Sequence, residues 1–199
     1  MVGIVVHGQP DIDHIIYIVN LWGTNIIVTV TSVAETWIEK ALQLRSDVYP
    51  KFTFIVGFAI DPEINTLQFC VGHYCLIFQL AHAATIPDCL RVFMKDSRIG
   101  FPGFKNLNYS QDLKSSKHAL EMFITPADLT LWQERLLNYS VTVDDMVKKC
   151  LGFRVQLKEE VMMSDWSVEG LSDEQVVYAC VKTHCAFRLG REFKVWRWG

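Results

Sequence analysis

The stretch Phe52-Thr53-Phe54-Ile55-Val56-Gly57-Phe58-Ala59-Ile60 is an almost continuous apolar run that ends at Asp61. A run of this kind is typical of a central strand buried on both faces of a sheet. Two further apolar runs follow at 67–70 and 75–80, and Gly72-His73 between them is typical of a turn. We therefore predict a buried strand at 52–60 followed by a β-hairpin.

The N-terminal part predicts another hairpin and a helix. Residues 14–21 and 26–30 are rich in β-branched side chains and flank Gly23-Thr24-Asn25, which is a hairpin signal. Ser32 and Glu35 are spaced as a capping box, and apolar residues then recur at helical spacing until Tyr49-Pro50.

The second half of the chain is mostly helical in pattern. A short helix opens at Ile86-Pro87, a short strand covers 99–101, and residues 153–170 form a loop. Three longer helices begin at Thr125-Pro126, at Thr142 and at the Ser172/Gln175 capping box.

Because strands cluster first and helices dominate the end, we predict an α/β fold with a central mixed β-sheet flanked by helices. We expect a single domain over 1–199, since no internal repeat, linker or composition break is visible. Within it, 1–45 forms the N-terminal hairpin and helix, 50–190 the core, and 191–199 an aromatic-basic tail.

The composition excludes several classes of protein. The chain has 199 residues, of which 50% are hydrophobic and 21% charged, so intrinsic disorder is excluded. Its net charge of −3 provides no global positive field, so any contact with nucleic acid is local. No apolar run approaches the ~20 residues that span a bilayer, and no leader is visible. We expect a protein of the cytoplasm, and also of the nucleus, with six reduced cysteines.

These stretches resemble the 3′–5′ exonucleases of the DEDD (DnaQ-like) superfamily. The segment 54–61 resembles the first strand of that family, and 66–72 with 75–80 resembles the next hairpin in its Werner-type branch. Asp165-Trp166-Ser167, together with Tyr178-Ala179, resembles the last motif of the branch. The N-terminal hairpin and helix resemble the small plant members, which include the RISC-interacting clearing exoribonucleases. The resemblance covers nearly the whole chain and implies a ribonuclease H-like fold.

The resemblance also implies a chemistry that the chain has largely lost. The family uses four carboxylates to hold two Mg²⁺ or Mn²⁺ ions that activate water and stabilise the leaving oxygen. Here Ala59 stands at the first Asp, Leu107 at the second-motif Asp and Lys182 at the last Asp. Asp61 keeps one carboxylate, and Tyr178 stands where the family orients the attacking water. We therefore expect Mg²⁺ or Mn²⁺ to bind weakly, if at all, at Asp61.

The remaining site residues leave alternatives open. Asp61 is either a residual metal ligand or a strand-end residue, and Tyr178 is either a catalytic or a core residue. Lys182 is either a desolvated amine, able to act as a base or form a Schiff base, or the ion-pair partner of Asp61. His184 follows on roughly the same side of the helix, so Tyr178, Lys182 and His184 form a candidate catalytic lining. Cys180 and His184 are either a zinc half-site, a nucleophile pair or packed core residues.

Small basic groups are candidates for contacts with single-stranded RNA. Lys114, Lys117 and Arg154 either bind phosphates or lie on solvated surfaces. Trp196 and Trp198 in the tail either stack on bases or dock onto protein.

We therefore expect an exonuclease-like protein that binds, or weakly trims, single-stranded RNA 3′ ends and forms a homo-oligomer. One alternative is a non-catalytic pseudo-nuclease that assembles with a protein partner. The other is a repurposed enzyme that uses Tyr178, Lys182 and His184 for acid–base chemistry on a small-molecule ligand.

Overall fold

The structure, a computed structural model, describes residues 2–7, 14–48, 54–105, 108–137 and 140–195. The strands are β1 (Val2–His7), β2 (His14–Leu21), β3 (Thr24–Thr31), β4 (Phe54–Ile55), β5 (Gly57–Ile60), β6 (Thr66–Val71), β7 (Tyr74–Gln79), β8 (Ile99–Gly100), β9 (Pro102–Gly103) and β10 (Ala127–Asp128). The helices are α1 (Glu35–Val48), α2 (Asp88–Met94), α3 (Tyr109–Ser115), α4 (Leu129–Leu137), α5 (Val143–Leu151), α6 (Glu159–Met162) and α7 (Asp173–Glu192).

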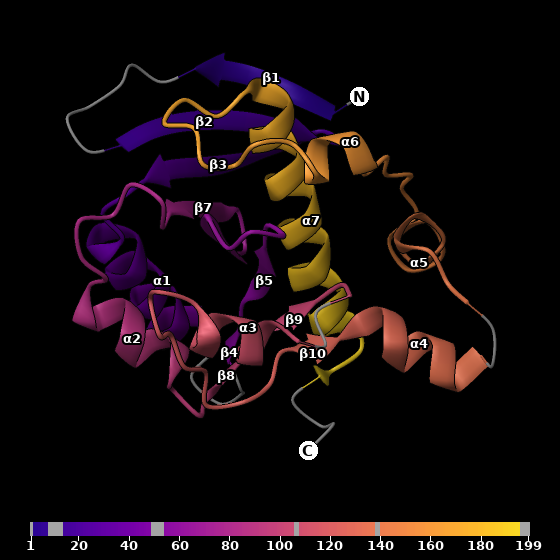
Figure 1. Cartoon of the computed structure of the whole chain (residues 1–199). Helices are drawn as coiled ribbons and strands as arrows, with labels where there is room; N and C mark the ends of the chain where they lie inside the picture. The colour runs from indigo at the N-terminus through magenta and orange to yellow at the C-terminus, as the bar shows by residue number, and fades with distance from the viewer. Residues whose placement is uncertain (1, 8–13, 49–53, 106–107, 138–139, 196–199) are drawn as a thin grey trace.

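A six-stranded sheet with the order β1-β2-β3-β7-β6-β5 forms the centre of the fold (Figure 1). Its neighbouring strands are antiparallel except for β3 and β7, which are parallel. Two parallel pairs, β4 with β8 and β9 with β10, continue beyond β5. Helix α7 lies along the sheet. Helices α1 and α2 lie at the lower left of the sheet in Figure 1. The predicted mixed sheet with flanking helices is confirmed.

The predicted single strand at 52–60 is wrong in one respect, because within the described part of this run the chain changes neighbours near Val56. Phe54 and Ile55 pair with β8, whereas Gly57–Ile60 pairs with β6. The backbone N–H of Val56 still donates to the carbonyl of Gly100 at 3.0 Å. An apolar pattern reports burial and does not report which strand accepts each hydrogen bond.

The predicted helix start at Thr125-Pro126 is also wrong. Residues 127–128 pair with β9, and helix α4 begins only at Leu129. The Asp128 carboxylate accepts hydrogen bonds at 3.0 Å from the backbone N–H groups of Thr130 and Leu131, so it satisfies donors at the helix start. The sequence patterns also missed β1, α3 and α6.

Phenylalanine rings fill the core next to β5. Phe58 packs against Phe69 and Phe101, with centroids 5.3 and 5.8 Å apart, and Phe93 lies 6.0 Å from Phe101. All four side chains are buried. Burial of this apolar area is the main driving force that holds α2 against the sheet.

Helix α7 crosses β5 at close range, and this contact positions the candidate site. The helix opens with the predicted capping box, in which the Ser172 hydroxyl accepts from the Gln175 N–H and the Gln175 side chain accepts from the Ser172 N–H. A Cβ on Gly57 would overlap the carbonyl oxygen of Thr183, so glycine permits the approach of helix to strand. This approach places the middle of α7 beside the carboxyl end of β5.

Candidate functional site

A cavity of about 830 Å³ lies at the carboxyl end of β5. Side chains from α3, α4, α5, α6 and α7 line it, and Figure 1 shows these helices around the lower and right-hand sides of α7. The titratable residues in the lining are Asp61, Lys105, Tyr109, Asp112, Glu134, Asp144, Glu159, Tyr178 and Lys182. Helix α7 therefore brings two of its predicted site residues together with Asp61.

The Asp61 carboxylate is committed to the turn that follows β5. Its Oδ2 accepts from the Thr66 N–H at 2.6 Å and from the Thr66 hydroxyl at 3.0 Å. Its Oδ1 accepts from the Glu63 N–H at 3.1 Å. The side chain is only 3% exposed, so these bonds compensate for its burial. Asp61 thus has a structural role that accounts for the residue without a metal ion.

Two other positions correspond to carboxylates in the family pattern, Ala59 in the first motif and Leu107 in the second. Ala59 is fully buried within β5, opposite Gln68 on β6, and offers only a methyl group. Asn106 and Leu107, on which the predicted second motif falls, lie outside the described residues.

Tyr178 lines the cavity and packs edge-on against Trp166, with ring centroids 6.2 Å apart. The Trp166 indole N–H donates to the carbonyl of Met162 at 3.1 Å, which holds this ring under Tyr178. Burial raises the pKa of Tyr178 to about 12. The hydroxyl is therefore protonated at neutral pH and can donate a hydrogen bond.

Lys182 lies one turn further along α7 and is 7% exposed. Burial lowers the pKa of Lys182 to about 8, although the charge of Asp61 acts in the opposite direction. Among the residues that the structure describes, no carboxylate oxygen lies within 4.0 Å of the amine. The ion pair with Asp61, which was one alternative, is therefore not formed.

His184 does not join Tyr178 and Lys182 at the cavity. A step of two residues turns a helix by about 200°, so His184 points toward the sheet instead. Its Nδ1 lies 3.8 Å from the Cys70 Sγ, its ring stacks near that of His73, and burial lowers its pKa. The predicted lining by Tyr178, Lys182 and His184 thus reduces to the first two.

The cysteines around His184 form a packed cluster. Burial raises the pKa of Cys70 and of Cys180 well above the usual value, and that of Cys185 to about 12. These thiols are protonated at neutral pH and poor nucleophiles. Across the described ranges, no three His, Cys, Asp or Glu side chains are placed to hold a metal ion.

A two-metal centre does not fit the described cavity. The carboxylate of Asp61 already accepts three hydrogen bonds, and the neighbouring Lys182 carries a positive charge below its pKa. Divalent cations need several free oxygen ligands, and an ammonium group repels them.

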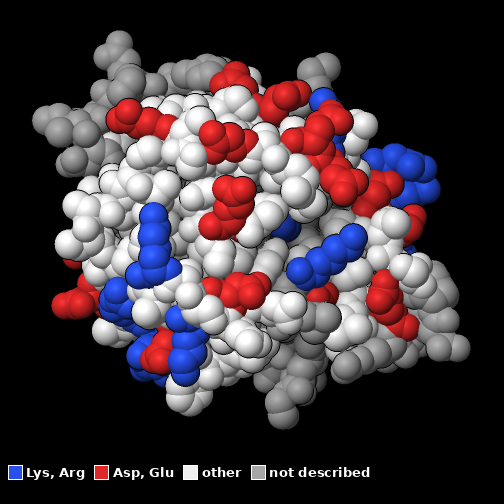
Figure 2. All heavy atoms as spheres, viewed as in Figure 1, with Lys and Arg blue, Asp and Glu red and all other residues white. Residues whose placement is uncertain are grey.

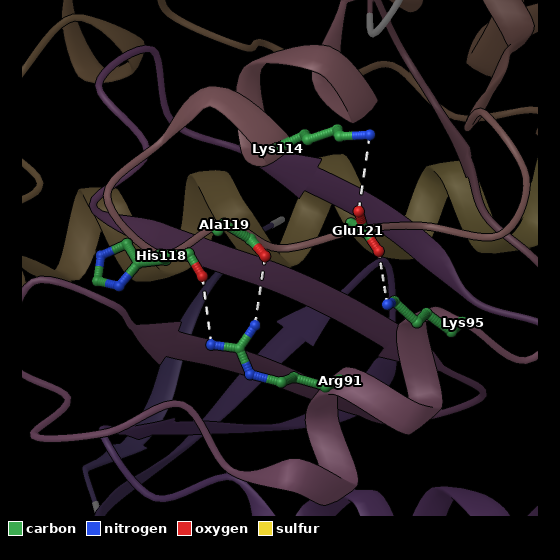
Figure 3. Close-up of polar contacts among 6 residues, drawn as sticks. All are labelled: Arg91, Lys95, Lys114, His118, Ala119 and Glu121. Carbon is green, nitrogen blue, oxygen red and sulfur yellow. Dashed lines mark hydrogen bonds and ion pairs between the residues drawn. The ribbon is translucent and has the colours of Figure 1, made fainter.

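The predicted RNA-contacting side chains are partly neutralised. Lys114 lies 3.6 Å from Glu121, which also pairs with Lys95 at 2.6 Å, as Figure 3 shows. Arg154 lies 3.5 Å from Asp144. Lys117 lies just after α3. Burial is the main cause that lowers the pKa of His118, and the charge of Lys117 lowers it further. The lining of the cavity does not include Lys114, Lys117 or Arg154.

The rim of the cavity is acidic. Asp112, Glu134, Asp144 and Glu159 line it, against Lys105 and the recessed Lys182. Figure 2 shows acidic side chains gathered around the hollow on this face. Tyr109 and Lys105 were missed by sequence reasoning, because their place at the cavity depends on the path of the chain after β9 and no motif marks it.

Comparison with known proteins agrees with this architecture. A family model described as 3′-5′ exonuclease matches residues 55–195. The chain therefore belongs to the 3′–5′ exonuclease family, whose DnaQ-like domain has the ribonuclease H-like fold seen here. No curated protein matches it.

Solved structures share the fold at low sequence identity. The Trypanosoma brucei RNase D, in complex with GMP, has a TM-score of 0.60 at 12% identity, covering 82% of this chain and 56% of that one. The Aedes aegypti Nibbler EXO domain has a TM-score of 0.58 at 15% identity, covering 77% and 82%. An EXD2 exonuclease domain soaked in Mn and Mg has a TM-score of 0.45 at 20% identity, covering 85% and 89%.

Proposed function

We propose that this protein binds single-stranded RNA 3′ ends and trims them weakly or not at all, because its described residues form no conventional two-metal centre. The proposal rests on the bonding of one cavity residue and the charge of another, within an exonuclease fold. Asp61 is bonded within its own turn, and an ammonium group at Lys182 stands at the position where the family resemblance implies the last carboxylate.

The loss of metal chemistry follows from charge. Two-metal hydrolysis needs ions that clamp both the attacking and the leaving oxygen. A single carboxylate that already accepts three hydrogen bonds binds such ions poorly, and a lysine nearby adds repulsion. None of the described helices is long and apolar enough to cross a membrane.

The binding part of the proposal is supported by the size and lining of the cavity. Its volume is within the ~300–1,000 Å³ of small-molecule sites, which accommodates one nucleotide. The rings of Tyr109 and Tyr178 line it, and aromatic rings stack on bases of any sequence. Because only two lysines line it, few phosphates are neutralised, and we expect a shallow salt dependence of RNA binding.

The test is a pair of assays on 5′-labelled single-stranded RNA with Mn²⁺ or Mg²⁺. Wild type, Asp61→Asn and Lys182→Ala are compared for 3′ shortening on a gel and for binding by fluorescence anisotropy. We expect binding in wild type and no processive shortening in any of the three proteins. Fast divalent-dependent digestion that Asp61→Asn abolishes would contradict the proposal, and so would the absence of RNA binding.

A repurposed small-molecule enzyme is a second candidate, favoured by the buried amine of Lys182. Near neutral pH an amine with a pKa of about 8 is partly deprotonated and can act as a base, with Tyr178 as a proton donor. Turnover of an organic substrate that Lys182→Ala abolishes, in the absence of RNA binding, would favour this candidate.

A further inference from the structure

Lys182 carries a buried positive group that lacks an anionic partner among the residues the structure describes. Its side chain is 7% exposed and lines the cavity, so what remains accessible faces that space. Among described residues no acidic oxygen approaches within 4.0 Å, and the nearest aromatic ring, that of Tyr178, has its centroid 5.8 Å from the amine. Buried charges in proteins are normally paired or coordinated.

We propose that the Lys182 ammonium binds one phosphate monoester group of a small ligand, without a divalent cation. The inference rests on the proposed function only because both place their ligand in the same cavity. The positive charge that metal ions supply in a two-metal site is here supplied by the side chain itself. An anion from outside completes the pairing that the fold leaves open.

The lining favours a phosphate over other anions. An ammonium is a compact point charge with three N–H donors. These donors can bond to the oxygens of a tetrahedral phosphate. The hydroxyls of Tyr109 and Tyr178 line the same cavity, and no hydrogen bond to another described residue engages them. Burial raises the pKa of both tyrosines, so both remain protonated donors for phosphate oxygens.

The rim favours a single phosphate inside the cavity. Asp112, Glu134 and Glu159 line the same cavity, so a second phosphate extending outward would meet carboxylates. Carboxylates do accept hydrogen bonds from sugar hydroxyls and base amino groups. A nucleoside monophosphate, or the terminal nucleotide of an RNA strand, places one phosphate and many donors inside the cavity and matches this arrangement.

Asp61 provides a variant that separates the two mechanisms. Its negative charge acts on Lys182 through space. In a metal-dependent site, Asp61→Asn removes the remaining ligand and abolishes binding. In the lysine-centred site, the same change removes a competing negative charge and also lowers the Lys182 pKa further, so phosphate binding is retained at a pH below that pKa, where the amine stays charged.

The experiment is isothermal titration of the full chain with uridine 5′-monophosphate in excess EDTA. Uridine serves as the probe without phosphate, and inorganic phosphate as the probe without nucleoside. We expect uridine monophosphate to bind wild type, Lys182→Met to weaken it at least about tenfold, and Lys182→Arg to retain most of the affinity. Lys148→Met, which removes an exposed lysine of α5 that does not line the cavity, should change the affinity by less than about threefold. Thermal unfolding of each variant checks that it is folded.

The outcomes separate this inference from the proposed function. If uridine monophosphate binds only with Mg²⁺ present, or binds Lys182→Met as well as wild type, the lysine-centred site is refuted. If a single-stranded RNA oligomer nevertheless binds, the proposed function stands alone. If the mononucleotide binds through Lys182 while RNA does not bind, the phosphate site is supported and the RNA proposal fails. Binding of inorganic phosphate as tightly as the mononucleotide supports the ammonium site and refutes the role of the rim.

Discussion

Replacement of Lys182 by methionine should stabilise the protein, and the gain should depend on pH. Burial lowers the pKa of Lys182 from 10.5 to about 8, and one pKa unit corresponds to roughly 1.4 kcal/mol. Keeping the ammonium charged in the folded state therefore costs about 3 kcal/mol near pH 7. Methionine has a similar length and no charge, so Lys182→Met removes this cost.

The sign of the pH dependence follows from proton linkage. Between the folded pKa near 8 and the unfolded value of 10.5, the unfolded chain binds more protons than the folded one. The stability of wild type therefore rises with pH in this window. The destabilisation is fully present below about pH 8, so the advantage of Lys182→Met shrinks from about 3 kcal/mol near pH 7 to about 1 kcal/mol near pH 10.

The assay is urea unfolding followed by circular dichroism at several pH values, in buffers without phosphate that could occupy the site. The quantity of interest is the difference in unfolding free energy between variant and wild type, because other titrating groups cancel in it. Lys148→Met is the matched control, since Lys148 is exposed on α5 outside the cavity lining and its removal should give a small difference that does not vary with pH. A Lys182→Met difference that stays constant between pH 7 and pH 10 would refute the assigned burial of the amine.

Three further predictions concern the elements around the cavity. Asp61→Ala loses three hydrogen bonds and should destabilise the protein by roughly 3–5 kcal/mol in urea unfolding, whereas Glu63→Ala, in the same turn, should cost under about 0.5 kcal/mol. Equal costs would contradict the structural role of Asp61. Gly57→Ala forces its Cβ onto the Thr183 carbonyl and should lower stability by at least about 2 kcal/mol, and an unchanged melting temperature would contradict the close packing of α7 on β5. Cys180 should react with iodoacetamide only at the rate of unfolding, and fast labelling of the native protein, read by mass spectrometry, would contradict its burial.

Much of the fold could be predicted from local patterns. The hairpins and the boundaries of α5 and α7 carry their own signals, such as Thr142 at the start of α5, Gly152 with φ 77° at its end, and the Ser172 capping box. These features depend on hydrogen bonds between residues close in sequence. The break at Val56 and the pairing of 127–128 with β9 escaped prediction because they depend on strands far away in the chain.

The same division holds within the site. Helical spacing by itself determined that Lys182 and Tyr178 share one side of α7, and the family resemblance implied that carboxylates are missing at family positions. Only the tertiary structure decided that Asp61 is bonded to Thr66, that Lys182 is buried without an acidic partner among the described residues, and that His184 faces the Cys70 thiol. Burial and partner choice are properties of surfaces brought together from distant segments. A residue's type and spacing set the chemistry it can offer, but the packing around it sets its charge and its access to a ligand.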